Sequence, residues 1–350
     1  MTKWGLIGCL GAVIFLNACT KEIESVNTAE FASGTPYRLE VPPGFPKPVI
    51  PANNPMTVEG VALGRRLFYD NLLSANNTMS CASCHLQNNA FTDPRRFSVG
   101  IDSIAGRRNA MPLFNLAWDR HFFWDGGSTN LESQAIDPIV NPIELHQPLT
   151  EMLAKLNAHP EYPALFQKAF GSSTIQTAMV AKAIAQFERS IISADSKYDR
   201  YLRGEESLTE QEQQGLQLYL DVDKGDCFHC HTMNGLFTDY EFRNTGLDSV
   251  YADDGRASIT LNPDDVGKFK TPSLRNIALT APYMHDGRFN TLMECVEHYN
   301  SGFNNHPNLD PNISTKERGR MTQAEMEAIV AFLNTLTDYS LIQNPNFSAP

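Results

Sequence analysis

The chain has 350 residues, a hydrophobic share of 42% and a formal net charge of -12. This length suffices for two domains of ordinary size, and the hydrophobic share is that of a folded protein. The negative charge argues against nucleic acid as a partner, because the phosphate backbone attracts basic surfaces. It leaves open docking with a basic protein or a small neutral substrate. No stretch approaches the roughly eighteen apolar residues of a membrane span.

The first residues are typical of an export signal. A short positive region precedes an apolar core over residues 5–16, which is too short to span a membrane. LNAC, residues 16–19, resembles a bacterial lipoprotein cleavage site with Cys19 as the acylated residue. LIGC, residues 6–9, is similar but has almost no apolar core before it, and a plain secretory peptide is the milder alternative. We therefore expect an exported, periplasmic protein that meets the membrane only through a lipid anchor at Cys19.

The next elements in chain order are mainly helical. A proline-rich segment, residues 41–55, is expected to lie extended on the surface. Apolar residues at helical spacing predict helices over residues 58–70, 175–192, 208–220 and 321–336. A shorter helix begins after Thr291, where Glu294 can close a capping box, and is expected to end at Gly302. Alternating strand patterns are few, so the sequence predicts a mainly α fold.

Two short patterns decide the class of protein. CASCH, residues 81–85, and CFHCH, residues 227–231, both read C-x-x-C-H, the pattern of c-type haem attachment. The thiols are those of Cys81, Cys84, Cys227 and Cys230, and the histidines are His85 and His231. Two thiols one helical turn apart can add to the two vinyl groups of one porphyrin, and the next histidine then lies beneath the iron. Paired zinc or disulfide sites are the alternatives.

The helices around these patterns indicate a duplicated haem module. One predicted helix leads into each pattern, and the last helix closes the second module. The acidic, polar run at residues 204–214 marks the boundary between domains. We therefore expect two cytochrome c-like domains, each with one covalently attached haem. The predicted organisation is a signal peptide at 1–18, a proline-rich segment at 19–55, and haem domains at 56–205 and 206–350, the second with a closing tail.

Several blocks in a fixed order resemble the bacterial di-haem cytochrome c peroxidase family and its MauG-like branch. They are GRRNAMPLFN, FFWDGG, NPIEL, AQFERSIISADSKYDRYL and KFKTPSLRNIALTAPYMHDGRFNTL. The resemblance covers nearly everything after Pro42. It implies two cytochrome c-like domains with a calcium ion between the haems, and an enzyme that acts on hydrogen peroxide.

The resemblance also implies roles for individual residues. His85 ligates the first haem iron and His231 the second. Gln134 and Glu144 match polar residues on the open side of the first haem, where a positioned carboxylate can move a proton between the two oxygens of peroxide. Trp124 matches a tryptophan that lies between the haems. From spacing alone, Glu144 could equally be an acid at a helix N-terminus, and Trp124 a core residue.

The resemblance implies a calcium site as well. Asn109 matches a side-chain ligand, while Thr280 and Pro282 match ligands that use their backbone carbonyls. Such oxygen donors suit a hard cation like Ca²⁺. Without the resemblance, Asn109 would be interpreted as a turn residue.

The sequence departs from conventional family members at both haems. Ile101 occupies the position of the histidine that closes the first haem in the oxidised protein, and an aliphatic side chain cannot ligate iron. We therefore predict a first haem that is open to peroxide without prior reduction. At the second haem, Tyr299 stands fourteen residues after His285, where conventional members have a methionine. This is the MauG-type pattern, in which a phenolate stabilises ferric and higher states.

Neighbours of Tyr299 have simpler interpretations. Met284 is a rival distal ligand for the second iron, and we interpret it as a packing residue. His298 is expected on the surface. Cys295 is expected to be a buried, inert thiol.

Three functions are compatible with these residues. The first is a peroxidase that draws electrons from a small exported donor, either a cytochrome c or a cupredoxin. The second is a MauG-like oxidase that uses peroxide to oxidise a partner protein, although Gly225 replaces the surface tryptophan through which the family's protein-oxidising member passes on oxidising equivalents. The third is a non-enzymatic electron carrier, which would gain nothing from Glu144 and Gln134. The sequence leaves the oligomeric state open, a homodimer included.

Overall fold

The computed structural model describes residue 1 and residues 33–350, so the predicted signal peptide and Cys19 lie outside the described residues. The fold is mainly helical, and a small antiparallel sheet pairs β1 (Phe242–Arg243) with β2 (Phe269–Lys270). The α-helices of the described residues are α1 (Val58–Tyr69), α2 (Leu131–Gln134), α3 (Asp137–Val140), α4 (Leu149–Ala158), α5 (Tyr162–Phe170), α6 (Thr177–Ser190), α7 (Lys197–Leu202), α8 (Glu210–Leu220), α9 (Ala257–Thr260), α10 (Leu292–Glu297), α11 (Pro311–Ser314), α12 (Gln323–Asn334) and α13 (Tyr339–Gln343). Within residues 33–350, no helix combines the length and the apolarity that crossing a bilayer requires.

The four main helices predicted from periodicity are confirmed as α1, α6, α8 and α12. The start of α1 and the end of α8 are as predicted, and the other ends lie one or two residues inside the predicted bounds. Thr209 and Thr322 each close a capping box before α8 and α12, so both predicted starts were slightly early. The capping box of Thr291 and Glu294 is confirmed at α10.

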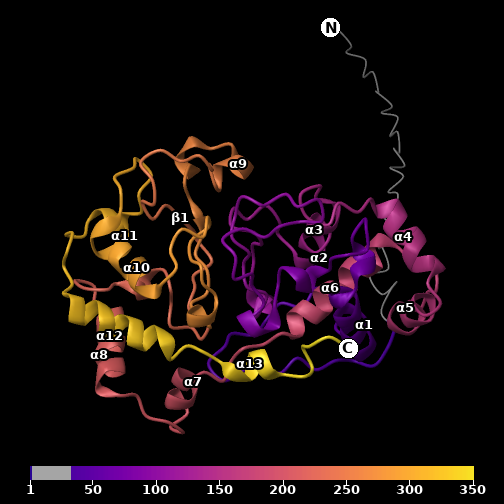
Figure 1. The fold of residues 1–350 in the computed structure, drawn as a ribbon, viewed down its shortest axis with the longest axis horizontal. Coiled ribbons are helices and arrows are strands. Elements are labelled where there is room, and N and C mark those ends of the chain that lie inside the picture. Colours follow the sequence, from indigo (N-terminus) through magenta and orange to yellow (C-terminus); the bar gives the residue numbers. More distant parts are fainter. Residues whose placement is uncertain (2–32) are drawn as a thin grey trace.

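The helices form two groups in Figure 1, one indigo to magenta and the other orange to yellow. In the first group α1 crosses α6, and in the second α8 crosses α12. A glycine lies at each crossing. A Cβ on Gly64 would lie 1.9 Å from Ala183 O, and one on Gly215 would lie 1.9 Å from Ala328 O. The same close approach of two helix backbones therefore occurs in both groups, as expected of a duplicated module.

Each crossing belongs to its own hydrophobic core. The first core gathers buried residues of α1, α4, α5 and α6 around Leu67, Met152 and Phe166. The second gathers residues of α8, α10 and α12 around Tyr219 and Phe332. One helix of each crossing, α6 in the first group and α12 in the second, lines a cavity, and each C-x-x-C-H pattern lines the same cavity as that helix.

The C-terminal segment and the proline-rich N-terminal segment both pack against residues of the first helix group. α13, drawn in yellow, runs back beneath the first group in Figure 1. Tyr69 donates its hydroxyl to Phe347 O at 2.6 Å, so the closing tail packs on the first module. The proline-rich segment is less exposed than we expected, because Phe45 packs edge-on against Trp118 and Pro46 O accepts the Trp118 indole N–H at 2.6 Å.

Candidate functional site

Each C-x-x-C-H pattern opens onto a cavity of its own. The first cavity has a volume of about 990 Å³ and the second about 210 Å³. The first is lined by Cys81, Cys84 and His85, and the second by Cys227, Cys230 and His231. Short 3₁₀ turns, η2 (Cys81–Ser83) and η5 (Cys227–His229), hold the thiols of each pattern on the cavity side.

Both histidines are fixed through the same ring nitrogen. His85 donates Nδ1–H to Phe91 O at 2.9 Å, and His231 directs Nδ1 to Phe237 O at 3.2 Å and Pro272 O at 3.1 Å. A carbonyl bond at Nδ1 leaves Nε2 as the nitrogen for a metal, which is how metal-binding histidines are usually oriented. Burial lowers the pKa of both rings, so each is neutral, as a ligand of iron must be.

The residues around each cavity fit a haem. The five described cysteines are free thiols, and in residues 33–350 no three or more His, Cys, Asp or Glu side chains gather as a metal-binding group. The disulfide and zinc alternatives are therefore not formed in this part of the chain. Two thiols and a histidine with a free Nε2, beside a largely apolar cavity, are the donor set of a c-type porphyrin.

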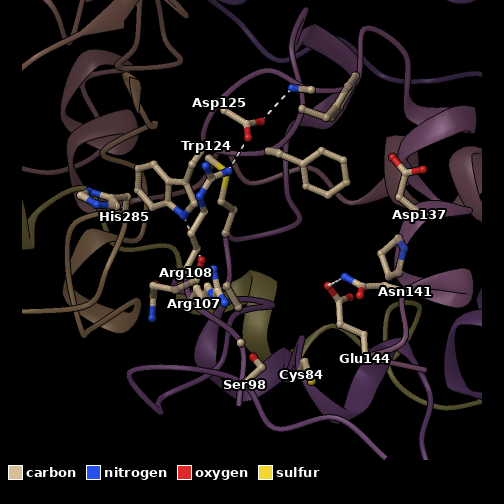
Figure 2. A pocket seen from close by; sticks show the side chains of 18 of the residues that line it. Cys84, Ser98, Arg107, Arg108, Trp124, Asp125, Asp137, Asn141, Glu144 and His285 are labelled. Carbon is tan, nitrogen blue, oxygen red and sulfur yellow. Dashed lines mark hydrogen bonds and ion pairs between the residues drawn. The ribbon is translucent and has the colours of Figure 1, made fainter. Parts of the chain in front are cut away.

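A polar wall lines one side of the first cavity. Gln134, Asp137, Asn141 and Glu144 all come from α2, α3 and the loop that follows. Asn141 donates Nδ2–H to Glu144 Oε1 at 2.7 Å, and Gln134 Oε1 is buried without a partner. Figure 2 shows Asp137, Asn141 and Glu144 along this side of the pocket. Gln134 and Glu144 therefore line the same cavity, and their roles beside a haem stay a prediction.

The pKa of Glu144 is shifted upward. Burial is the main cause, the negative charge of Asp137 adds to it, and the hydrogen bond from Asn141 opposes it. Asp137 itself was missed by the sequence analysis. Helix spacing gave no signal for it, because Gln134 ends α2 and Asp137 begins the separate helix α3.

The hairpin loop that contains Ile101 is hydrogen-bonded to the backbone of Glu144. Ile101 donates its backbone N–H to Glu144 O at 3.0 Å, and Asp102 pairs with His146 Nδ1 at 2.8 Å. Gly100 leaves no room for a side chain here, since a Cβ would lie 2.2 Å from Ile143 O. The loop that carries Ile101 is therefore pinned to the rim of the cavity.

Trp124 lies between the two cavities and lines both of them. Its indole N–H donates to Asn109 O at 2.9 Å, and its carbonyl accepts from the Lys270 backbone N–H of β2 at 2.7 Å. His285 lies beside it in Figure 2 and stacks on Phe269, with ring centroids 3.6 Å apart. These contacts hold the indole in the one wall that the cavities share.

The three predicted calcium ligands gather at the second cavity, since Asn109, Thr280 and Pro282 all line it. Asn109 donates Nδ2–H to the carbonyls of Arg95 and Arg96, both at 3.3 Å. Its Oδ1 is therefore turned the other way as an acceptor. The arrangement is compatible with a calcium site, which stays a prediction.

Tyr299 lines the second cavity from the segment that directly follows α10. Leu292, Cys295, Val296 and Tyr299 share one face and all line the cavity, as the helical spacing predicted. After Glu297 the helix widens into the π-helical segment η8 (His298–Gly302), a distortion that is frequent at functional sites. Burial raises the pKa of the Tyr299 phenol, so only a bound cation would make it ionise at neutral pH.

Met284 also lines the second cavity, so the structure places both candidate ligands there. Its side chain packs beside the cluster of Leu247, Tyr251 and Phe269, in agreement with the packing interpretation. The choice of Tyr299 over Met284 stays a prediction.

The structure shows the surroundings of two side chains near Tyr299, those of His298 and Cys295. His298 is buried, with 5% of its surface exposed, and its Nε2 lies 2.9 Å from Thr245 O. The expectation of a surface position was wrong, because the segment after β1 packs against His298. Burial raises the pKa of the Cys295 thiol, which agrees with an unreactive cysteine.

Two charged residues of the first cavity were also missed. Arg108 pairs with Asp125 at 2.5 Å and with Asp253 at 2.7 Å, and so joins loops of the two helix groups. Glu188, on α6, is buried in the cavity wall. The sequence analysis quoted the blocks that contain Arg108 and Glu188 without assigning a role to either, because the ion pair to Asp253 and the burial of Glu188 involve segments far apart in the chain.

Comparison with known proteins defines the class of this one. The family model described as di-haem cytochrome c peroxidase matches residues 58–207. MauG of Methylorubrum extorquens is 34% identical over 344 residues, 96% of this chain and 94% of the relative. Cytochrome c peroxidase Ccp of Escherichia coli is 35% identical over 302 residues, 82% of this chain and 60% of the relative.

A solved structure is also similar. A MauG-like protein associated with microbial copper homeostasis has a TM-score of 0.83 and 39% identity, covering 90% of this chain and 99% of the other. These matches define a di-haem oxidoreductase. The chain belongs to the bacterial di-haem cytochrome c peroxidase family, whose members include both peroxidases and MauG.

Proposed function

We propose that this protein is a di-haem c-type peroxidase that reduces hydrogen peroxide in the first cavity. Haems attached covalently through the four thiols, with His85 and His231 as axial ligands, would supply the redox chemistry. The observation that carries the proposal is the polar wall of the first cavity, where Glu144 and Gln134 line the same cavity as His85.

Glu144 is suited to move a proton within bound peroxide. Reduction requires a proton to leave the oxygen nearer the axial histidine and to reach the oxygen that departs as water. Burial raises the pKa of the Glu144 carboxyl, which makes it a better proton acceptor than an exposed carboxylate. Asn141 fixes its orientation through the 2.7 Å hydrogen bond, and the unpartnered Gln134 Oε1 can accept an O–H of the substrate.

Access to this cavity does not depend on removing a side-chain ligand. Ile101 offers no donor atom to a metal, and its backbone is bound to Glu144 O. We infer that peroxide enters the fully oxidised protein. An electron carrier without enzymatic activity would not need this buried, partly unpartnered polar wall.

The second cavity receives the oxidising equivalents in this proposal. Trp124 lies in the shared wall, and Asn109, Thr280 and Pro282 would hold a calcium ion that stiffens this region. Tyr299 would be the distal ligand of the second haem. The electrons would come from a small exported donor, a cytochrome c or a cupredoxin, and the protein would be anchored in the periplasm through acylated Cys19.

A second candidate function is oxidation of a partner protein. Tyr299 favours it, because an anionic oxygen ligand stabilises oxidised iron and disfavours uptake of electrons from a high-potential donor. Similarity to a MauG-like solved structure supports it too. The surface tryptophan through which oxidising equivalents could leave the protein is absent, because residue 225 is glycine. A side chain would not fit there, since a Cβ would lie 2.4 Å from Leu218 O. Oxidation of a partner would thus use another route.

Stopped-flow mixing of the fully oxidised, haem-loaded protein with peroxide tests the proposal. We expect a rapid change in the haem spectrum without prior reduction. A spectrum that changes only after reduction would overturn it. Subsequent mixing with reduced cytochrome c or a reduced cupredoxin separates the two candidates, because fast return to the starting spectrum indicates a donor-fed peroxidase. Persistence of the oxidised spectrum, with modification of a co-expressed partner, indicates a protein oxidase.

A further inference from the structure

Glu188 is a buried acid of the first cavity that the mechanism above does not use. It lies on α6, its residue is 3% exposed, and its side chain lines the cavity. Its Oε2 is fully buried and has no hydrogen-bond partner. Buried polar atoms are nearly always paired, so an unpartnered carboxyl oxygen that faces a cavity requires an explanation.

The adjacent cation is not available to balance Glu188. Arg189 is bound to Glu132 through both oxygens, at 2.7 and 2.9 Å, and Glu132 also accepts from Asn54 Nδ2 at 2.6 Å. That pair is complete without Glu188. Burial is accordingly the main cause that raises the pKa of Glu188 to about 8, while Arg189 opposes the shift and Glu132 adds to it.

Within residues 33–350, the arginines of α1, which crosses α6, are bound to other groups. On α1, Arg66 pairs with Glu161 and Arg65 binds carbonyls of the closing tail, so both point elsewhere. From η2, Cys81 is the titratable neighbour, and a thiol attached to haem carries no charge. At neutral pH, Glu188 is therefore an acid that still holds its proton.

Helix register directs Glu188 toward the polar wall. Leu131 of α2 and Ala185 of α6 pack in one buried cluster. Gln134 and Glu188 follow them by three residues, which places each on the same helix face as its packed neighbour. Gln134 Oε1 is an acceptor without a donor, and a protonated Glu188 has a donor without an acceptor. One side chain therefore lacks a hydrogen-bond donor and the other lacks an acceptor, and both line the same cavity.

We propose that Glu188 is a proton donor of the first cavity, which passes its proton toward the reacting peroxide through a water held by Gln134. The inference rests on the proposed function. Reduction of one peroxide to two waters consumes two electrons and two protons. Glu144 only transfers a proton between the peroxide oxygens, so protons must also be supplied. Glu188 would give one of these protons to the oxygen that stays behind, as that oxygen is reduced to the second water. Glu188 would then be a carboxylate and regain a proton from solvent, while the electrons come from the reduced donor or from the partner protein that is oxidised.

The experiment compares wild type with Glu188→Gln, using the haem-loaded full chain, and Glu151→Gln as an exposed-carboxyl control. Infrared spectra at pH 7 should show a protonated carboxylic acid that Glu188→Gln removes and Glu151→Gln retains. Peroxide consumption by Glu188→Gln should fall about 100-fold, the lower end of what a positioned acid contributes. Wild-type consumption should decline as the pH rises through about 8, and the variant should lack this decline.

The outcomes separate the two proposals. If wild type consumes no peroxide, the proposed function fails, and the infrared band still reports the state of Glu188. If wild type consumes peroxide and Glu188→Gln matches it in rate and pH profile, only the proton-donor role fails. An ionised Glu188 at pH 7 would also overturn it. Should Glu188→Gln not fold, Glu188→Asp keeps the acid but shortens its reach, and an unchanged rate in that variant would equally contradict the proposal.

Discussion

The two cavities share a scaffold and differ in their walls. Each opens beside a pair of crossing helices that touch at a glycine, and each has two thiols and a histidine anchored through Nδ1. The first cavity then adds carboxyl and amide side chains from α2 and α3. The second adds mostly apolar groups from α10 and α12, with the Tyr299 phenol among them. The duplicated scaffold therefore fixes where a haem is held, and the wall decides what can react there.

The strongest way to break this contrast is to remove the acid of the first wall. Glu144→Gln keeps the shape and loses the transferable proton, so kcat/KM for peroxide should fall by about 10² to 10⁴. Steady-state peroxide consumption measures this, and the spectrum of the second haem should not change. Asp137→Asn is the matched variant, because Asp137 acts on Glu144 only by raising its pKa. The fall in kcat/KM should therefore be smaller for Asp137→Asn than for Glu144→Gln. Equal activity of Glu144→Gln and wild type would contradict the mechanism.

The next effect concerns stability and pH. The pKa of Glu188 is about 8 in the folded chain, against 4.5 for a free glutamate. Between these values the unfolded chain has lost a proton that the folded chain keeps, so the free energy of unfolding falls by about 1.4 kcal/mol per pH unit. Glutamine has no such dependence. Glu188→Gln should thus stabilise the protein by about 3 kcal/mol at pH 7 and by less than about 1 kcal/mol at pH 5.

Denaturant unfolding of the haem-loaded protein at the two pH values measures this difference. Glu151→Gln, on the exposed first turn of α4, is the control and should show no such gain. The gain in unfolding free energy of Glu188→Gln over wild type should be larger at pH 7 than at pH 5. An equal gain at both pH values would mean that Glu188 is ionised in the folded chain.

A smaller effect tests the wall that the cavities share. Trp124→Phe removes the donor to Asn109 O and leaves that carbonyl without its partner, which should cost about 1–3 kcal/mol of unfolding free energy. Trp118→Phe is a matched control, since it loses a similar indole bond to Pro46 O away from both cavities. Stopped-flow spectra should show that only Trp124→Phe delays the response of the second haem to peroxide. The same delay in both variants would argue against a role for Trp124.

The variant with the smallest expected change in stability, Tyr299→Phe, tests the wall of the second cavity. Tyr299→Phe should alter the spectrum of the second haem while changing the free energy of unfolding by about 1 kcal/mol or less, as expected for one hydroxyl. The first haem should be unaffected. Met284→Leu is the counterpart and should leave both spectra unchanged. Low-temperature EPR of the oxidised protein distinguishes the variants, and the reverse result would assign the ligand position to Met284.

The sequence by itself determined the parts of this protein that depend on local geometry. The two C-x-x-C-H patterns, the main helices and the capping box at Thr291 follow from spacings of a few residues, and the structure keeps them. The family resemblance added the placement of Glu144, Gln134 and Trp124 around the cavities. The helices and the capping box could be inferred because backbone geometry repeats with a fixed period along a helix, whereas these three placements rest on the resemblance.

Only the tertiary structure decided which polar groups are buried and what they face. Glu188 reads as one of several charges on α6, yet the crossing with α1 and the contact with α2 bury it while Arg189 binds Glu132 instead. His298 appeared exposed until the segment at Thr245 covered it. Burial, and with it the pKa of an acid, is set by residues far apart in the chain, so no local spacing reports it.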